Sequence, residues 1–151
     1  FGQDVVDEDQ QALKESKFNE LPDPVLLQVR LLFDGGYLAR AQALLKEDYS
    51  RLMSNEKLKL EAAYRSARIN HGLRQYSPAI HEYLRVLDMG KNSEAYYTCA
   101  AALNIGLIYE TLHYPLLARK YYDQCLSLSP DTYRNSLHQK AKAGINRVEK
   151  K

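Results

Sequence analysis

The chain lacks most of the features that mark membrane proteins, disulfide-rich domains and low-complexity segments. Its 151 residues include no tryptophan, two cysteines, five prolines and seven glycines. The longest apolar run, 96–109, contains Asn104 and is too short to cross a bilayer, so we predict no membrane span. With 45% apolar residues, the chain has enough to bury the core of one ordinary domain.

No signal peptide is visible at the start of the sequence. The first residue is Phe1 rather than Met, so we expect either a processed product or a fragment of a longer chain. We predict a soluble protein and leave its compartment open. The two compartments that we leave open are the cytoplasm and, if a signal peptide has been removed, the periplasm.

Strand patterns are missing as well, because no segment alternates apolar and polar residues with enrichment in Val, Ile or Thr. Apolar residues recur instead at helical spacing, as Ile80, Leu84 and Leu87 do. Breakers such as Gly35-Gly36 separate the helical segments. We therefore predict an all-α chain with helices over 24–34, 37–48, 55–73, 78–89, 94–113, 115–128 and 131–149, and a weaker one over 7–18.

Helix starts are marked by residues with short polar side chains. Asp23 stands directly before Pro24, a combination that predicts an N-cap followed by a first-turn proline. Ser54, Ser77 and Ser93 are predicted to cap later helices in the same way.

The sequence carries no signature of catalysis or of a metal site. It has no glycine-rich phosphate loop, and His81-Glu82 does not continue into a zinc-protease motif. Cys99 and Cys125 fit no zinc or CxxC spacing, so we interpret them as buried free thiols, with a disulfide in an oxidising compartment as the alternative. We predict a protein that is not an enzyme and has no cofactor and no metal. The histidines are interpreted as surface or half-buried polar residues.

Charge is unevenly distributed, although the net charge is only +2. Residues 1–23 hold seven acidic side chains against two lysines, whereas residues 132–151 hold six basic side chains against Glu149. We interpret both regions as solvated helix faces. The alternative is attraction between the acidic arm and the basic end, within one chain or between two. Because the basic residues form no dense run, we predict no nucleic-acid binding.

A period of 38 to 39 residues organises the sequence. Small residues recur at Ala41, Ala79 and Ala118, and each is followed four residues later by a larger apolar side chain. A second series with the same period consists of Val29, Ala67, Gly106 and Gly144.

Gly106 stands inside a strongly apolar helical stretch, where glycine sacrifices about 1 kcal/mol of helix propensity relative to alanine. Close packing of two helices side by side offsets that loss. We therefore predict that Gly106 and Ala118 mark the closest approach of a helix pair, with Tyr109 and Tyr122 filling the wider gaps beside it.

The third unit resembles the tetratricopeptide repeat, whose pattern is W-x2-L-G-x2-Y, then A-x3-F, then P. The sequence reads Ile105-Gly106-x2-Tyr109, then Ala118-x3-Tyr122, then Pro130, with Ala102 at the first aromatic position. The middle unit is looser, since it has Ser66-Ala67-x2-Asn70 and then Ala79-x3-Tyr83, and the first unit is degenerate. The stretches 32–37 and 135–147 also resemble the C-terminal part of bacterial repeat proteins.

This resemblance implies an α-α superhelix, a right-handed solenoid of about three helix pairs with a C-terminal capping helix. The acidic arm would cover 1–23 and the repeat domain 24–151. The repeats would span about 24–53, 54–92 and 93–130, and the cap 131–149. Because the period exceeds the family's usual 34 residues, the resemblance leaves the pitch and groove shape open.

For function, the resemblance implies a protein-interaction module that binds a peptide or a partner helix in a concave groove. The alternative is a structural or self-associating solenoid segment that packs against the rest of a longer chain. In this family the first helix of each pair lines the groove. The groove residues implied here are Tyr64, Arg65, Arg68, His71, Leu103, Asn104, Leu107, Glu110, Thr111, His138 and Lys142.

Some members of the family hold a partner's C-terminal carboxylate with basic and Asn side chains from successive first helices. By resemblance, Arg68, Asn104 and Lys142 would provide such a clamp, and the partner would be acidic or would carry a free C-terminal carboxylate. The family's Lys and Asn from the first repeat have no counterpart, because Val25 and Val29 stand in that region.

Overall fold

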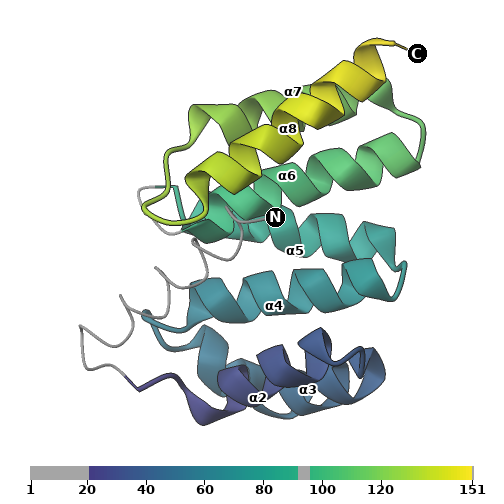
Figure 1. The fold of residues 1–151 in the computed structure, drawn as a ribbon. Helices are drawn as coiled ribbons and strands as arrows, with labels where there is room; N and C mark the ends of the chain where they lie inside the picture. The colour runs from purple at the N-terminus through teal and green to yellow at the C-terminus, as the bar shows by residue number, and fades with distance from the viewer. Residues whose placement is uncertain (1–20, 92–95, 151) are drawn as a thin grey trace. The chain divides into compact units, whose positions relative to one another are not determined.

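The computed structural model describes residues 21–91 and 96–150, and every regular element in these ranges is an α-helix (Figure 1). The helices form hairpins of neighbours in the sequence and divide into two compact units, one of which is Pro22–Met89. The all-α prediction is therefore confirmed. The predicted helix 7–18 and the predicted cap Ser93 lie outside the described residues.

The Pro22–Met89 unit contains α2 (Pro24–Asp34), α3 (Leu38–Met53), α4 (Lys59–Gly72) and α5 (Tyr76–Met89). Each helix packs on the next, and α4 also packs on α2. Its apolar core consists of residues that recur at helical spacing and are almost completely buried: Leu26, Val29, Ala41, Leu45, Leu52, Ala62 and Ile69.

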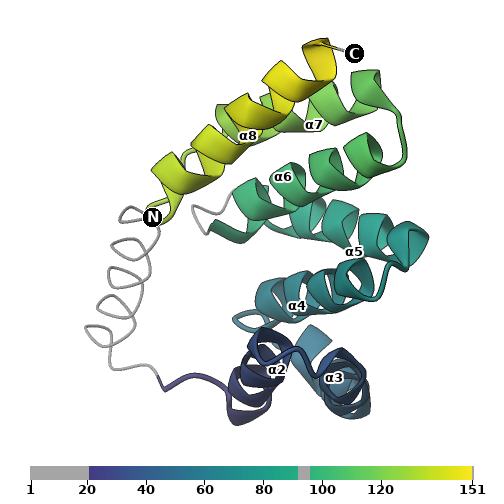
Figure 2. The same cartoon turned by 45° about the vertical axis from the view of Figure 1, so that its right-hand side comes forward.

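The other unit contains α6 (Tyr96–Thr111), α7 (Pro115–Ser127) and α8 (Arg134–Glu149). Helix α7 packs against both α6 and α8, and Figure 2 shows α8 running alongside α7. The thiols of Cys99 and Cys125 are free and buried here, with their Sγ atoms 3.5 Å apart, which confirms the predicted state of both.

Tyr122 of α7 occupies the centre of this second unit and is completely buried. A Cβ atom added at Gly106 would lie 2.6 Å from its ring, and one added at Gly144 would lie 2.4 Å from it. The two glycines therefore make room for one aromatic ring from α6 and from α8. The prediction that Tyr122 fills a gap beside the close approach is wrong, because its ring is itself what the glycines accommodate.

The three hairpin turns share one hydrogen-bond pattern. In each turn an amide returns to the carbonyl five residues earlier: Tyr37 to Leu32, Gln75 to Asn70 and Tyr114 to Tyr109, at 2.8 to 2.9 Å. The residue just before each of these amides has a positive φ, namely Gly36, Arg74 and His113. This left-handed helix end recurs with the period found in the sequence, and it fixes where each second helix begins.

The helix ends test the predicted caps. The carboxylate of Asp23 accepts from the amides of Val25 and Leu26 at 3.1 and 3.2 Å, as predicted. Ser54 does not cap α4, because α3 continues to Met53 and the Ser54 hydroxyl donates to the carbonyl of Ser50 at 2.9 Å. Helix α8 begins at Arg134 rather than at 131, since Tyr133 has a left-handed φ of 62° that cannot continue a helix.

Ser77 is not a cap either, because α5 starts one residue earlier, at Tyr76.

Candidate functional site

Two arginines of α4 lie over aromatic rings of the same unit. The guanidinium carbon of Arg65 is 5.8 Å from the ring centroid of Tyr64, and that of Arg68 is 5.0 Å from the ring centroid of Phe33 on α2. Arg65 also pairs with Glu61, one turn earlier on α4, at 3.1 Å. Such stacking restricts the guanidinium groups to defined positions on this helix.

Tyr64 and His71 on the same helix serve mainly as packing residues. Tyr64 is only 4% exposed, and its ring lies 6.2 Å from the ring of Tyr83. Nδ1 of His71 lies 3.1 Å from the hydroxyl of Tyr83. Burial, and then the nearby charge of Arg68, lower the pKa of His71 to about 4, so its imidazole is neutral at neutral pH.

On α6, most of the predicted groove residues are engaged within their own unit. Leu103 and Asn104 are buried, and the Asn104 amide donates to the carbonyl of Ala100 at 2.8 Å. Leu107 is half-buried, and the hydroxyl of Thr111 donates to its carbonyl at 2.9 Å.

Glu110 forms a polar network across three helices. Its carboxylate accepts from the hydroxyl of Tyr122 at 2.5 Å and from the guanidinium of Arg147 on α8 at 2.8 Å. This network connects α6, α7 and α8, so the carboxylate of Glu110 has a structural role in this unit.

On α8, His138 and Lys142 differ in their surroundings. Nε2 of His138 lies 2.7 Å from the carbonyl of Leu128, whereas Lys142 is exposed. The structure therefore places Tyr64, Arg65, Arg68 and His71 together on α4 of one unit. It places the remaining predicted residues on α6 and α8 of the other.

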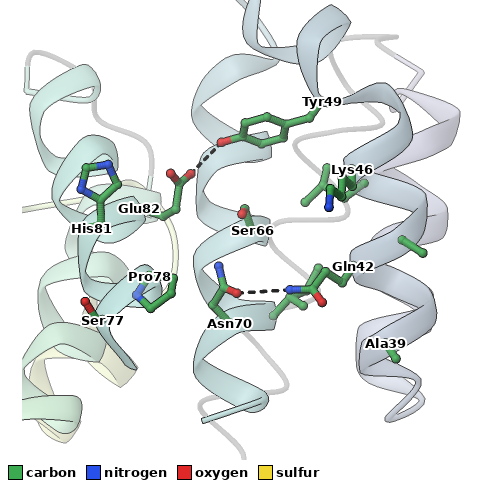
Figure 3. A pocket seen from close by; sticks show the side chains of 13 residues that line it. Ala39, Gln42, Lys46, Tyr49, Ser66, Asn70, Ser77, Pro78, His81 and Glu82 are labelled. Atoms are coloured by element: carbon green, nitrogen blue, oxygen red, sulfur yellow. Dashed lines mark hydrogen bonds between the residues drawn. The ribbon is translucent and has the colours of Figure 1, made fainter. Parts of the chain in front are cut away.

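The Pro22–Met89 unit also contains a cleft of about 820 Å³ that the sequence did not predict (Figure 3). We call it the α3–α5 cleft, because its walls are α3 and α5, which both pack on α4. Its lining consists of Ala39, Gln42, Ala43, Leu45, Lys46, Tyr49, Ser66, Ile69, Asn70, Ser77, Pro78, His81 and Glu82.

Two hydrogen bonds between side chains line the α3–α5 cleft, one from α3 to α5 and one from α3 to α4, as the dashed lines in Figure 3 show. The hydroxyl of Tyr49 on α3 donates to Glu82 on α5 at 2.6 Å, and Glu82 also pairs with Arg85 at 3.1 Å. Burial and the bond to Glu82 raise the pKa of Tyr49 well above its usual value. The amide of Gln42 donates to the side-chain oxygen of Asn70 at 3.2 Å.

The signal for this cleft was present in the sequence. Ser66 and Asn70 stand where the repeat pattern has Leu and Tyr, so α4 offers small polar side chains toward the space between α3 and α5.

Across 21–91 and 96–150, no group of three or more His, Cys, Asp or Glu side chains is placed to hold a metal ion. Within the same ranges, no helix has both the length and the apolar character needed to cross a membrane.

Comparison with known proteins supports the repeat found in the sequence. Residues 100–132 match the family model of the tetratricopeptide repeat, which covers most of α6, all of α7 and the turn after it. A search of curated proteins finds no match to the chain. Tetratricopeptide repeats are in general modules for protein–protein interaction rather than enzymes. Residues 100–132 are therefore similar to a tetratricopeptide repeat, and the hairpin turn inside this match has the same hydrogen bonds as the turns of the two earlier helix pairs.

Proposed function

We propose that this chain is a protein-interaction module that binds a peptide or a partner helix on the first helices of its hairpins. The observation that carries the proposal is the arginine–aromatic cluster of α4, formed by Phe33, Tyr64, Arg65 and Arg68. Arginine is among the residues most often found at the energetic centres of protein interfaces, and the buried ring of Tyr64 would support Arg65 from below rather than contact the partner. Stacking on a ring also reduces the entropy that a guanidinium loses when it binds a carboxylate.

The partner we propose for this face is acidic or carries a free C-terminal carboxylate. Arg68 would contact that group on the Pro22–Met89 unit. On the other unit, taken by itself, the exposed Lys142 would contact an acidic group of a partner. Asn104 would contribute only after its amide leaves the carbonyl of Ala100.

The test is titration of a peptide library, with free and with amidated C-termini, against the parent and single variants. Arg68→Ala and Lys142→Ala should each reduce binding by about 1.5–3 kcal/mol if they make charged hydrogen bonds. Lys140→Ala, an exposed lysine on the same helix as Lys142, is the matched control and should bind like the parent. Binding that ignores both substitutions would refute the proposal.

The second candidate function is self-association or packing against another part of a longer chain. It is favoured by four exposed apolar side chains around the α6–α7 turn: Leu112, Tyr114, Leu116 and Leu117. Leu116 is 86% exposed. Sedimentation of the parent and of Leu116→Ser would distinguish the two functions. A dimer in the parent that dissociates in the variant would support self-association.

A further inference from the structure

We propose that the α3–α5 cleft is a second binding site, which takes an extended peptide segment with an acidic side chain and recognises its backbone. This site lies between the second helices of two hairpins. It uses none of the α4 side chains invoked for the proposed function.

The cleft exists because large side chains are missing from the middle of α4. Ser66 and Asn70 are small and half-buried. At the matching positions of α6 stand Ile105, which is buried, and Tyr109, whose ring stacks on Tyr121 at 5.8 Å. The side chains at Ala39, Ala43 and Ser77 on the walls are short as well, which leaves further space in the cleft.

The paired amides of Gln42 and Asn70 offer the groups that a peptide backbone needs. Their mutual bond uses one N–H of Gln42 and the oxygen of Asn70. The oxygen of Gln42 and the NH₂ group of Asn70 form no other hydrogen bond with residues 21–91 or 96–150. If both amides were turned over, the pair would still present one acceptor and one donor. A residue in an extended chain presents one N–H and one C=O, which match these two groups.

The length and charge of the cleft restrict the ligand further. Gln42, Lys46 and Tyr49 lie on successive turns of α3, a span of about 10 Å that fits roughly three extended residues. Figure 3 shows Lys46 and Ser66 between the two hydrogen-bonded pairs. Lys46 is exposed and forms no ion pair with a residue in the described ranges, whereas Glu82 is already bonded to Tyr49 and Arg85. The cleft therefore favours an acidic side chain beside the recognised backbone.

The test uses blocked peptides and NMR titration of the full chain. The probe is acetyl-Ser-Val-Asp-Val-Ser-amide, whose blocked ends exclude recognition of a terminal carboxylate. We expect shift changes in α3, α4 and α5. Methylation of the central backbone nitrogen should weaken binding about tenfold, because one hydrogen bond is lost. Replacement of the central Asp by Asn should weaken binding by a similar factor through loss of the charge pair with Lys46.

Two variants test the protein side. Ser66→Leu with Asn70→Tyr restores the repeat pattern, fills the cleft and should abolish binding. If that variant fails to fold, Asn70→Asp keeps the size of the side chain, removes its N–H donors and should weaken binding more than tenfold. Lys46→Gln should weaken binding about tenfold, while Lys57→Gln, an exposed lysine outside the cleft, should leave it unchanged.

Several outcomes would overturn the proposal. They are no shift changes with millimolar peptide, equal binding of the methylated peptide, or shift changes that survive the filled cleft. Shifts that appear on concentrating the chain alone and vanish in the filled-cleft variant would assign the cleft to a second copy instead. Arg68→Ala should leave binding to the cleft intact, so this proposal and the proposed function fail independently.

Discussion

Gly144→Ala tests the packing of Tyr122, because helix propensity and core packing predict opposite changes in the free energy of unfolding. Helix propensity alone predicts that alanine stabilises the middle of α8 by about 1 kcal/mol. The new Cβ, however, would lie 2.4 Å from Cζ and 2.5 Å from Cε2 of Tyr122. The ring has little freedom to retreat, because Gly106 lies against it and its hydroxyl is bonded to Glu110. Overpacking of a core costs about 1–3 kcal/mol, and we expect the upper part of that range.

The net expectation is a loss of about 1–2 kcal/mol, or a fall in melting temperature of roughly 2–8 °C for a chain of this size. The assay is thermal and urea unfolding followed by circular dichroism. Gly72→Ala is the control, because the atoms nearest to its added Cβ all belong to the flexible side chain of Leu38, with Cδ1 the closest at 2.9 Å. Gly144→Ala should become stabilising when Tyr122 is replaced by Leu. A variant that is more stable than the parent, with Tyr122 in place, would refute the packing argument.

Three further predictions concern single side chains. Asp23→Ala should destabilise the chain by about 1 kcal/mol in urea unfolding through loss of the α2 cap, and Asp23→Asn should retain most of the stability. The pKa of His71 is lowered from 6.5 to about 4 in the folded chain, so as the pH falls His71 is protonated in the unfolded chain before it is protonated in the folded one. Stability should therefore fall as the pH drops from about 6.5 to 4, and unfolding curves of His71→Gln should lack this part of the pH dependence. Cys99 and Cys125 should resist a thiol reagent in the folded chain and react after denaturation, whereas rapid labelling without denaturant would contradict their burial.

The helices could be predicted from the sequence because the small packing residues and the turns between helices recur with the same period. The 38–39-residue spacing that links Ala41, Ala79 and Ala118 reappears as three turns with the same hydrogen bonds. The predicted helix ends were wrong where the backbone has a left-handed conformation at a residue type that rarely adopts it. Arg74, His113 and Tyr133 adopt left-handed conformations that the sequence would place at glycine or asparagine, so the start of α8 was predicted too early.

The candidate site was less predictable. Helical spacing predicts on which face of a helix a residue lies, but not which side chains or carbonyls it contacts. Arg68 lies on α4, within the helix predicted over 55–73, but its stacking on Phe33 depends on how α2 packs on α4. Asn104 was predicted as a ligand group, and its bond to Ala100 is visible only once the rotamer is known. The α3–α5 cleft was missed because it is defined by side chains that are absent, Leu and Tyr at positions 66 and 70.

The origin of that cleft has a consequence for how repeat proteins diversify. Its walls are ordinary second helices, and the hairpin that contains Ser66 and Asn70 has the same turn geometry as its neighbour with Ile105 and Tyr109. Two short side chains in place of two long ones thus open a cavity without changing the course of the backbone. In such repeats, substitution of large side chains by small ones can create a binding cleft in a single repeat. The reverse substitutions would fill the cleft again. Individual repeats of one array are therefore free to specialise while the scaffold around them stays the same.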